Sequence, residues 1–226
     1  AGSPAGGRGW GVSENTIRVA LCDDHAMVRD ALALVLEHES DIEVVGSVAT
    51  SAEMLPLVGS KRPDVAILDV RLVEESGVDL AQKIRAEYPE CHIVMLTSFE
   101  SDIALVNSHE AGASAFLLKT GNFDELVSAV RKAAQGARLI DPAAVREAMR
   151  RIRLDGASII ADLDETDLQI LRLLATGQSD KQIAEAVYLS LQTVRNRVSR
   201  LLNRFGKENR TQLAVFIARL LPELGG

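Results

Sequence analysis

Apolar residues in the first part of the chain form short runs separated by stretches of helical periodicity. The short runs are predicted to be strands because they are bounded by turn residues. They cover residues 17–22, 42–49, 65–69, 92–97 and 115–119. Helical spacing, as at Leu32, Val35 and Leu36, is found near residues 26–38, 52–59, 78–87, 101–111 and 123–135. Apolar strands that alternate with helices predict an α/β fold, a doubly wound five-stranded parallel sheet covered on both faces.

The second part of the chain has a different pattern, because strand-like runs end before residue 162. Helical patterns follow at residues 164–175, 180–187, 191–204 and 210–221, which predicts a second, all-α domain. Between the two parts, Asp141 and Pro142 are typical of a helix cap and first position, and this helix is expected to end before Gly156. The expected organisation is a flexible tail or expression remnant at 1–15, a domain at 16–135, a linker with one helix at 136–161 and a domain at 162–226.

Composition narrows the class of protein. The chain has 226 residues, of which 47% are hydrophobic and 25% charged, as in globular domains. No apolar run approaches the roughly 20 residues of a membrane span, and no secretory signal is evident. Cys22 and Cys91 lie in apolar strand-like contexts that suit reduced thiols. We therefore expect a cytoplasmic protein with no membrane partner.

Charge is unevenly distributed along the chain. The net charge is −7, yet from Ile160 onward there are nine Lys or Arg against eight Asp or Glu. Between Arg195 and Arg210 there are six basic residues and one acid, Glu208. A local basic face within an acidic protein indicates nucleic-acid binding by that segment.

Carboxylates follow two of the predicted strands. Asp23 and Asp24 end the first strand and Asp69 ends the third. In the sheet order 2-1-3-4-5 these strands are neighbours, so the acids converge. Two carboxylates about 5 Å apart repel by roughly 3 kcal/mol at an effective dielectric near 20. A hard divalent cation such as Mg²⁺ best explains three acids in one cleft.

Two further groups complete the predicted site. Thr97 ends the fourth strand with a hydroxyl, and Lys119 ends the fifth with an ammonium. Acids, a hydroxyl and a lysine around one pocket suit phosphoryl transfer to a carboxylate. Asp69 is the expected nucleophile because it stands alone on the central strand, ahead of a loop that closes on Gly77.

The segments CDDH, VAILDVRL, VMLTS and AFLLK, in this order, resemble the flavodoxin-like receiver domain of two-component response regulators over about residues 16–135. The resemblance implies that Asp69 is the phosphoacceptor and that Asp23, Asp24 and Asp69 bind Mg²⁺ together with the backbone carbonyl of Arg71. It implies that Thr97 and Lys119 sense phosphate. Phe116 occupies the position of the switch aromatic, although core packing explains it equally well.

The sequence departs from the receiver pattern at two positions. Receivers often carry proline four residues after the phosphoacceptor, where this chain has Val73, and proline after the lysine, where it has Thr120. The first change is expected to loosen the loop, and the second leaves open whether the Lys119–Thr120 bond is cis. His25, next to the acidic pair, is interpreted as an exposed helix-start residue rather than a metal ligand.

A helix, a tight turn and a second helix are predicted over residues 179–206. Ser179 and Gln182 form a capping-box pattern, and Ser190 is placed to cap the second helix. The inward stripe of that helix is apolar, and its outward side chains suit phosphate and base-edge contacts in a major groove. These outward residues are Gln192, Thr193, Arg195, Asn196, Arg197 and Arg200.

The segment from Leu163 to about Ile217 resembles the LuxR-type helix-turn-helix. By resemblance, Lys181 to Val187 form the scaffold helix, with Lys181 among the DNA-binding residues, and Leu191 to Leu202 form the recognition helix. Family members commonly carry Lys and His where this chain has Arg195 and Arg197, so the base preference is open. The final helix of the family pairs two subunits. We expect it here to expose four residues for dimerisation: Leu213, Phe216, Ile217 and Leu220.

Together the two resemblances indicate the NarL/FixJ class of response regulators. They imply phosphorylation of Asp69 by a sensor histidine kinase, a homodimer on activation and binding to double-stranded promoter DNA. Enzymatic activity is limited at most to autocatalytic phosphoryl transfer and dephosphorylation. Three alternative functions compete with this interpretation. A haloacid-dehalogenase-type phosphatase would need a second acid where Arg71 stands. The others are DNA binding without phosphorylation and a helical half that binds a protein instead of DNA.

Overall fold

The computed structural model describes residues 16–73, 75–207 and 209–220. The predicted tail, residues 1–15, lies outside the described residues. The chain divides into two compact units, with the boundary between Ala148 and Met149. Each unit is described by itself. Within the described residues, no helix combines the length and the apolar composition needed to cross a membrane.

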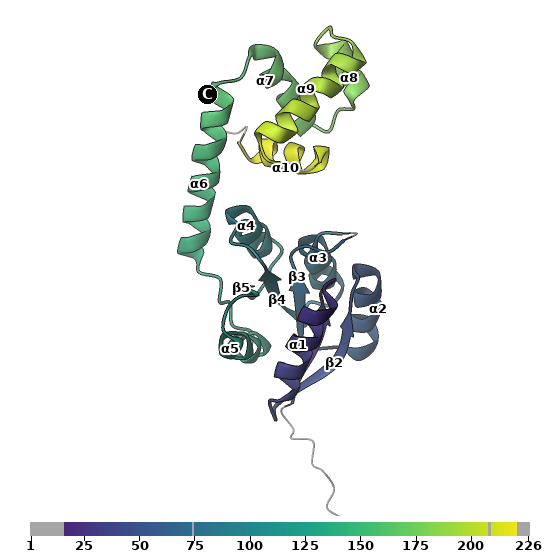
Figure 1. Cartoon of the computed structure of the whole chain (residues 1–226), viewed down its shortest axis with the longest axis vertical. Helices are drawn as coiled ribbons and strands as arrows, with labels where there is room; N and C mark the ends of the chain where they lie inside the picture. The colour runs from purple at the N-terminus through teal and green to yellow at the C-terminus, as the bar shows by residue number, and fades with distance from the viewer. Residues whose placement is uncertain (1–15, 74, 208, 221–226) are drawn as a thin grey trace, which may run out of the picture. The chain divides into compact units, whose positions relative to one another are not determined.

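The first unit contains a five-stranded parallel sheet of order β2-β1-β3-β4-β5, which confirms the predicted α/β fold (Figure 1). Its strands are β1 Ile17–Cys22, β2 Ile42–Val48, β3 Val65–Asp69, β4 His92–Thr97 and β5 Ala115–Leu118. Its helices are α1 Ala26–Glu37, α2 Ser51–Lys61, α3 Gly77–Glu87, α4 Asp102–Glu110 and α5 Phe123–Ala134.

Helices cover both faces of this sheet (Figure 1). On one face, Leu32 and Leu36 of α1 and Val130 of α5 join a buried cluster with alternate strand residues such as Val19 and Ile67. On the other face, α2, α3 and α4 contribute buried side chains, among them Met54, Leu80, Ile84 and Val106. Because β3 is buried on both faces, its sequence is continuously apolar up to Asp69.

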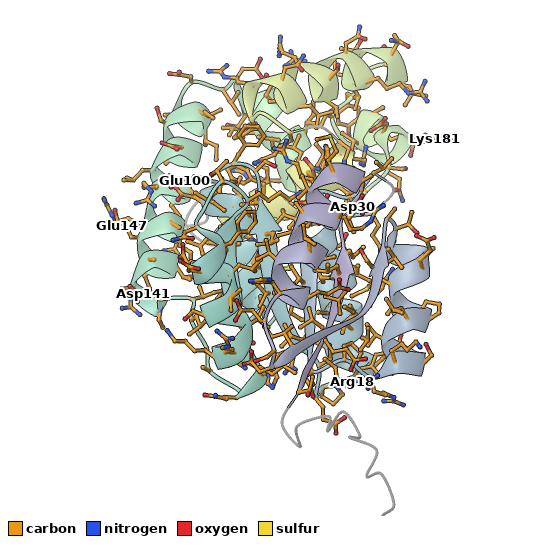
Figure 2. All side chains as sticks on the ribbon, turned by 60° about the horizontal axis from the view of Figure 1, so that its bottom comes forward. Arg18, Asp30, Glu100, Asp141, Glu147 and Lys181 are labelled. Carbon is orange, nitrogen blue, oxygen red and sulfur yellow. The ribbon has the colours of Figure 1, made fainter. Side chains whose placement is uncertain are left out.

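Helix α6, Pro142–Ala161, begins as predicted and ends later than predicted. Oδ1 of Asp141 accepts a hydrogen bond from the Ala143 N–H at 2.8 Å, so Asp141 caps the helix (Figure 2). The expected end before Gly156 is wrong. A Cβ at Gly156 would lie 2.5 Å from Cδ1 of Leu220, so this glycine allows close packing and does not stop the helix.

The second unit is helical, and its helices after α6 are α7 Glu165–Ala175, α8 Asp180–Ala186, α9 Leu191–Arg204 and α10 Arg210–Leu220. The capping box of Ser179 and Gln182 is present, and the side chain of Ser190 accepts from the Thr193 N–H at 3.1 Å. The inward stripe of α9 places Val194, Val198 and Leu201 in the core of the unit. Local sequence rules therefore predicted the helix-turn-helix correctly.

The final helix, α10, does not expose the residues expected to pair two subunits. Leu213 and Ile217 are fully buried and Leu220 is 6% exposed, all three in the core of the unit. Phe216 is half-buried and packs at a tilt on Phe205, with the ring centroids 5.8 Å apart. The apolar stripe of α10 closes the core of its own unit, so the expectation of exposure was wrong.

Candidate functional site

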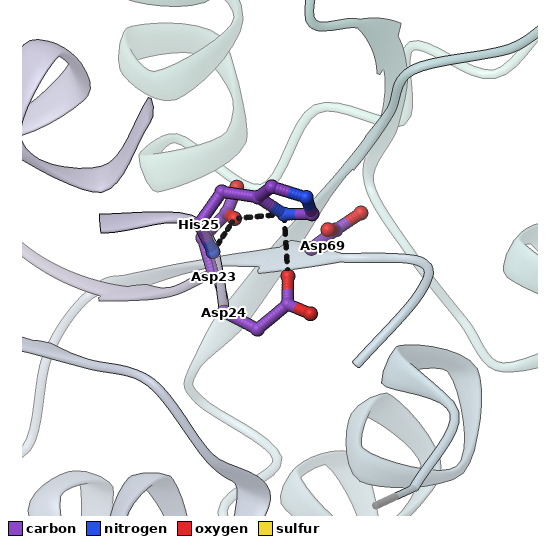
Figure 3. Close-up of side chains that lie close together, drawn as sticks. All are labelled: Asp23, Asp24, His25 and Asp69. Atoms are coloured by element: carbon purple, nitrogen blue, oxygen red, sulfur yellow. Dashed lines mark hydrogen bonds and ion pairs between the residues drawn. The ribbon is translucent and has the colours of Figure 1, made fainter. Parts of the chain in front are cut away.

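Four titratable side chains cluster where the first and third strands end (Figure 3). Ligand atoms of Asp23, Asp24, His25 and Asp69 all lie within 4.8 Å of one another. Asp23 and Asp69 are buried, and His25 is the exposed N-cap residue of α1. Nδ1 of His25 lies 2.6 Å from Oδ1 of Asp24. The topology thus brings the three acids together as the strand order predicts.

Lys119 joins this cluster from the end of β5. Its Nζ donates to Oδ2 of Asp69 at 2.6 Å and lies 2.7 Å from Oδ2 of Asp23. The Lys119 side chain is only 8% exposed, so the ammonium is largely removed from water. Its backbone N–H also donates to the carbonyl of Thr97 at 2.7 Å, which ties together the ends of β4 and β5.

Burial and ion pairing have opposite effects on the pKa of Asp69, and also on the pKa of Lys119. Burial raises the pKa of the Asp69 carboxyl, and the hydrogen bonds from Lys119 and from the Arg71 N–H offset only part of that effect. For Lys119, burial opposes the charged form, but the carboxylates of Asp23 and Asp69 outweigh it and raise its pKa. The lysine therefore stays charged while it faces two acids.

The loop after β3 is built tightly around Asp69. Oδ1 of Asp69 accepts from the backbone N–H of Arg71 at 3.2 Å. The first residue of α3, Gly77, packs against the same strand end, because a Cβ there would lie 1.7 Å from the Asp69 carbonyl oxygen. Glycine is thus required where the loop closes. Val73, in the middle of this loop, is 82% exposed.

Thr97 is buried beside the site and engages its own loop. Its Oγ1 donates to the Phe99 carbonyl at 3.2 Å and accepts from the Phe99 N–H at 3.4 Å. Phe116 is half-buried on β5. Ala115 and Leu117 pack toward α1 and α5, so Phe116 faces the opposite side of the sheet. No peptide bond in the described residues is cis, so the Lys119–Thr120 bond is trans.

Two features of the site were not predicted. Nη1 of Arg29, on α1, donates to the Asp23 carbonyl at 2.6 Å and so braces the acidic loop. A hollow of about 280 Å³ opens beside Asp24, lined also by Ala49, Thr50, Ser51, Leu72 and Val73. A single basic residue six positions after an acid forms no recognisable motif, so the role of Arg29 could not be predicted.

A second polar surface lies on α9. Gln192, Arg195, Asn196 and Arg200 are exposed on this helix, and Nε2 of Gln192 donates to Oδ1 of Asn196 at 3.0 Å. Thr193 is half-buried, and its Oγ1 lies 2.8 Å from Oγ of Ser190 at the helix cap.

Basic side chains near this surface differ in their solvent exposure and in their carboxylate partners. Lys181, in the first turn of α8, is exposed (Figure 2). The side chain of Arg195 is 59% exposed, with its Nε 3.8 Å from Oδ2 of Asp180. Arg197 is half-buried, and its Nη1 donates to Asp167 at 2.6 Å and to Asp164 at 2.9 Å. The predicted outward orientation of Arg197 is therefore wrong, because it faces the start of α7.

The two units match two protein-family models. Residues 19–131 match the response regulator receiver domain, and residues 161–217 match the bacterial regulatory proteins of the luxR family. The chain belongs to the response regulators that join these two domains, the NarL/FixJ class. Members of this class are phosphorylation-controlled transcription regulators, with a kinase and promoter DNA as partners, and receiver domains bind Mg²⁺ at an acidic pocket.

Individual relatives cover nearly the whole chain. The DNA-binding transcriptional activator DevR/DosR of Mycobacterium tuberculosis is 37% identical over 206 residues, which are 90% of this chain and 95% of that protein. The response regulator VraR of Staphylococcus aureus is 32% identical over 89% of this chain and 96% of its own length. The crystal structure of ChrA, a response regulator in a heme-sensing two-component system, is 28% identical with a TM-score of 0.51, covering 92% of this chain and 98% of that one.

Proposed function

We propose that Asp69 accepts a phosphoryl group from a sensor histidine kinase. The observation that carries this proposal is the convergence of Asp23, Asp24 and Asp69 with Lys119 at one edge of the sheet. An oxygen of Asp69 attacks the phosphorus of a phosphohistidine. The P–O bond forms as the P–N bond breaks, and the imidazole leaves with its electron pair and takes up a proton. We propose that any enzymatic activity is at most this autocatalytic transfer and later hydrolysis of the acyl phosphate.

The acidic cluster fits a divalent cation. Oδ2 of Asp23 lies 2.7 Å from Nζ of Lys119, which also pairs with Asp69, and Oδ1 of Asp24 lies 2.6 Å from Nδ1 of His25, so one lysine faces two of the three clustered carboxylates. Carboxylates whose oxygens lie within 4.8 Å of one another repel, and a divalent cation with oxygen ligands relieves that repulsion. Asp23, Asp24 and Asp69, with the carbonyl of Arg71, would hold Mg²⁺. When bound, the ion neutralises negative charge on the transferred group.

We propose that Thr97 and Lys119 read the phosphorylated state. A phosphoryl group on Asp69 offers new acceptor oxygens to the Lys119 ammonium and to the Thr97 hydroxyl. Thr97 would then exchange its bond to the Phe99 carbonyl for one to phosphate, which changes the loop after β4. Phe116, on the same side of the sheet as α4, is the proposed aromatic that repacks in response.

DNA binding is assigned to the exposed face of α9, with Lys181 as an additional cation. Gln192 and Asn196 offer base-edge contacts, and Arg195 and Arg200 offer charge-assisted bonds to phosphate or guanine. We propose that phosphorylation promotes a homodimer that binds two half-sites of promoter DNA. The stripe of α10 that closes the core is not available for that dimer contact. Binding to promoter DNA also supports a cytoplasmic location.

The proposed domain limits are 16–135 for the receiver and 162–226 for the DNA-binding domain, with residues 136–161 as the linker. The core of the second unit also includes Ile160. The helical linker therefore contributes structurally to the DNA-binding domain.

The test compares wild type and Asp69→Asn, each with Mg²⁺, with and without a small phosphodonor. Dimer formation is measured by sedimentation and DNA affinity by fluorescence anisotropy. We expect the phosphodonor to strengthen both properties in wild type alone. Equal activation of Asp69→Asn, or equal binding in all four samples, would exclude Asp69 as the switch and favour a regulator that works without phosphorylation.

A further inference from the structure

The recognition helix carries arginines that are not equally available to DNA. This inference rests on the proposed DNA-binding role of α9. Arg197 is bound by two carboxylates at the start of α7: Oδ1 of Asp167 at 2.6 Å and both oxygens of the N-cap residue Asp164 at 2.9 and 3.1 Å. Its side chain is 25% exposed, against 59% for Arg195. Arg197 is therefore already engaged within the protein before DNA arrives.

Asp167 holds a second arginine of the same helix. Its Oδ2 accepts from Nη2 of Arg200 at 2.7 Å, while that arginine keeps a side chain that is 60% exposed. Asp167 itself is buried, at 4% exposure. The backbone of Asp167 is also held in place, because its N–H donates to Oδ1 of Asp164 at 2.7 Å. The two acids, the N-cap of α7 and a residue of its first turn, thus form one rigid acceptor.

The charges within this group cancel. Arg197 and Arg200 contribute two positive charges, and Asp164 and Asp167 contribute two negative charges. These four residues therefore add no net charge to the surface of α9 that faces DNA. Arg195 is different, since its nearest carboxylate, Asp180, is 3.8 Å away and also contacts Arg210. The salt dependence of DNA binding depends on how many phosphates the protein neutralises.

We propose that Asp164 and Asp167 are positioning residues that decide which arginines of α9 are available to contact DNA. They bind Arg197 within the domain, so that it does not contact DNA. They also fix the direction in which the side chain of Arg200 extends. By cancelling two arginine charges they weaken binding to any duplex regardless of sequence. Contacts to the bases are then left to Gln192, Asn196 and Arg195, whose Nε lies 3.8 Å from the carboxylate of Asp180.

The test measures affinity by anisotropy between 50 and 200 mM salt for two duplexes. One has a random sequence, and the other is the tightest binder selected from a randomised library. The proteins are phosphodonor-treated full-length chains: wild type, Arg195→Gln, Asp164→Asn and the double variant Arg197→Gln with Asp164→Asn. Asparagine retains the N-cap function, so these variants keep α7. Glu165→Gln is the matched control, because it removes the same charge one residue away, where the partner is Arg172.

Arg195→Gln should make the plot of log affinity against log salt shallower by about 0.9, the value for one phosphate contact. The double variant should keep the wild-type slope, because it removes one charge of each sign. Asp164→Asn should steepen the slope by up to about 0.9, or about 3.5-fold in affinity across this salt range. The random and the selected duplex should gain affinity by a similar factor, because a contact to phosphate does not depend on sequence.

Two results would overturn the inference while leaving DNA binding by α9 intact. One is a double variant whose slope falls as much as that of Arg195→Gln, which would make Arg197 a phosphate contact. The other is Asp164→Asn behaving like Glu165→Gln. Absence of binding by wild type, or an Arg195→Gln slope equal to wild type, would instead overturn the proposed DNA-binding role and the inference with it.

Discussion

The ammonium of Lys119 lies 2.6 Å from Oδ2 of Asp69, so the proposed nucleophile and its proposed sensor are already paired before any phosphoryl transfer. The pair is largely buried, with side-chain exposures of 8% and 4%. Breaking a buried pair leaves an uncompensated charge, which costs far more than an exposed pair contributes. Lys119 is therefore expected to stabilise the acidic site as well as to read its state.

Lys119→Gln should lower the free energy of unfolding by about 3 kcal/mol in EDTA, the typical cost of removing one partner of a buried pair. Mg²⁺ should recover more stability in this variant than in wild type, since the ion replaces the missing positive charge. Urea unfolding with and without Mg²⁺ measures both effects. Lys83→Gln, which breaks an exposed pair with Glu75, is the control and should change little. Equal losses in the two variants would contradict the structural role of Lys119.

Asp24→Asn should weaken Mg²⁺ binding with little effect on the fold. Asp24 belongs to the carboxylate cluster, and the substitution removes its charge while its oxygen can still face Nδ1 of His25. A ligand stabilises in proportion to the logarithm of its concentration over its dissociation constant. The Mg²⁺-induced rise in melting temperature should therefore be smaller in Asp24→Asn. The exposed Asp30, on helix α1 that follows the acidic pair, supplies the control, Asp30→Asn, which should keep the wild-type response.

His92 should make the protein less stable at acid pH. Burial lowers its pKa below the usual 6.5, and the cations of Arg85 and Arg138 add to this effect. As the pH falls below about 6.5, the unfolded chain takes up the proton before the folded chain does, so stability declines until the folded pKa is passed. His92→Gln should show a smaller loss of unfolding free energy between pH 7.5 and pH 5.5. An identical loss in both proteins would assign the acid sensitivity to other groups.

Gly77→Ala should destabilise the first unit, because its Cβ would overlap the backbone carbonyl of Asp69. The loop must move, and a cost of about 1–3 kcal/mol is typical of such overpacking. Gly59→Ala is a contrasting variant within α2, since its new Cβ meets the flexible end of the Tyr88 side chain. Alanine in a helix is favoured over glycine by about 1 kcal/mol, so this variant should be neutral or stabilising. Thermal unfolding measures both effects: the melting temperature should fall in Gly77→Ala and stay the same or rise in Gly59→Ala. A melting temperature of Gly77→Ala equal to that of wild type would contradict the prediction.

Much of the first unit could be predicted because its signals are local. The run VAILD gave the bounds of β3, since a strand buried on both faces is apolar until it reaches the sheet edge. The convergence of Asp23 with Asp69 followed from strand order alone. The bracing of Asp23 by Arg29 did not, because its hydrogen bond goes to a backbone carbonyl and needs no partner side chain.

The errors in the second unit arise from contacts between residues distant in sequence. Gly156 has the local character of a helix end, but it is a contact point for Leu220. The apolar stripe of α10 indicates burial without saying which surface covers it, so Leu213 could not be assigned to its own core rather than to a second subunit. Arg197 bonds to carboxylates 30 and 33 residues away, a pairing that helical periodicity does not predict.

The packing of Gly156 against Leu220 has a practical consequence for dissecting the protein. A fragment cut at residue 161, where the luxR-family match begins, would lack both Gly156 and Ile160, and so would lose part of its own core. A fragment that begins at Met149 retains them. When this regulator is divided for crystallisation or for fusion to another sensor, the junction should therefore lie within the first two turns of α6. The rest of α6 should stay attached to the DNA-binding domain.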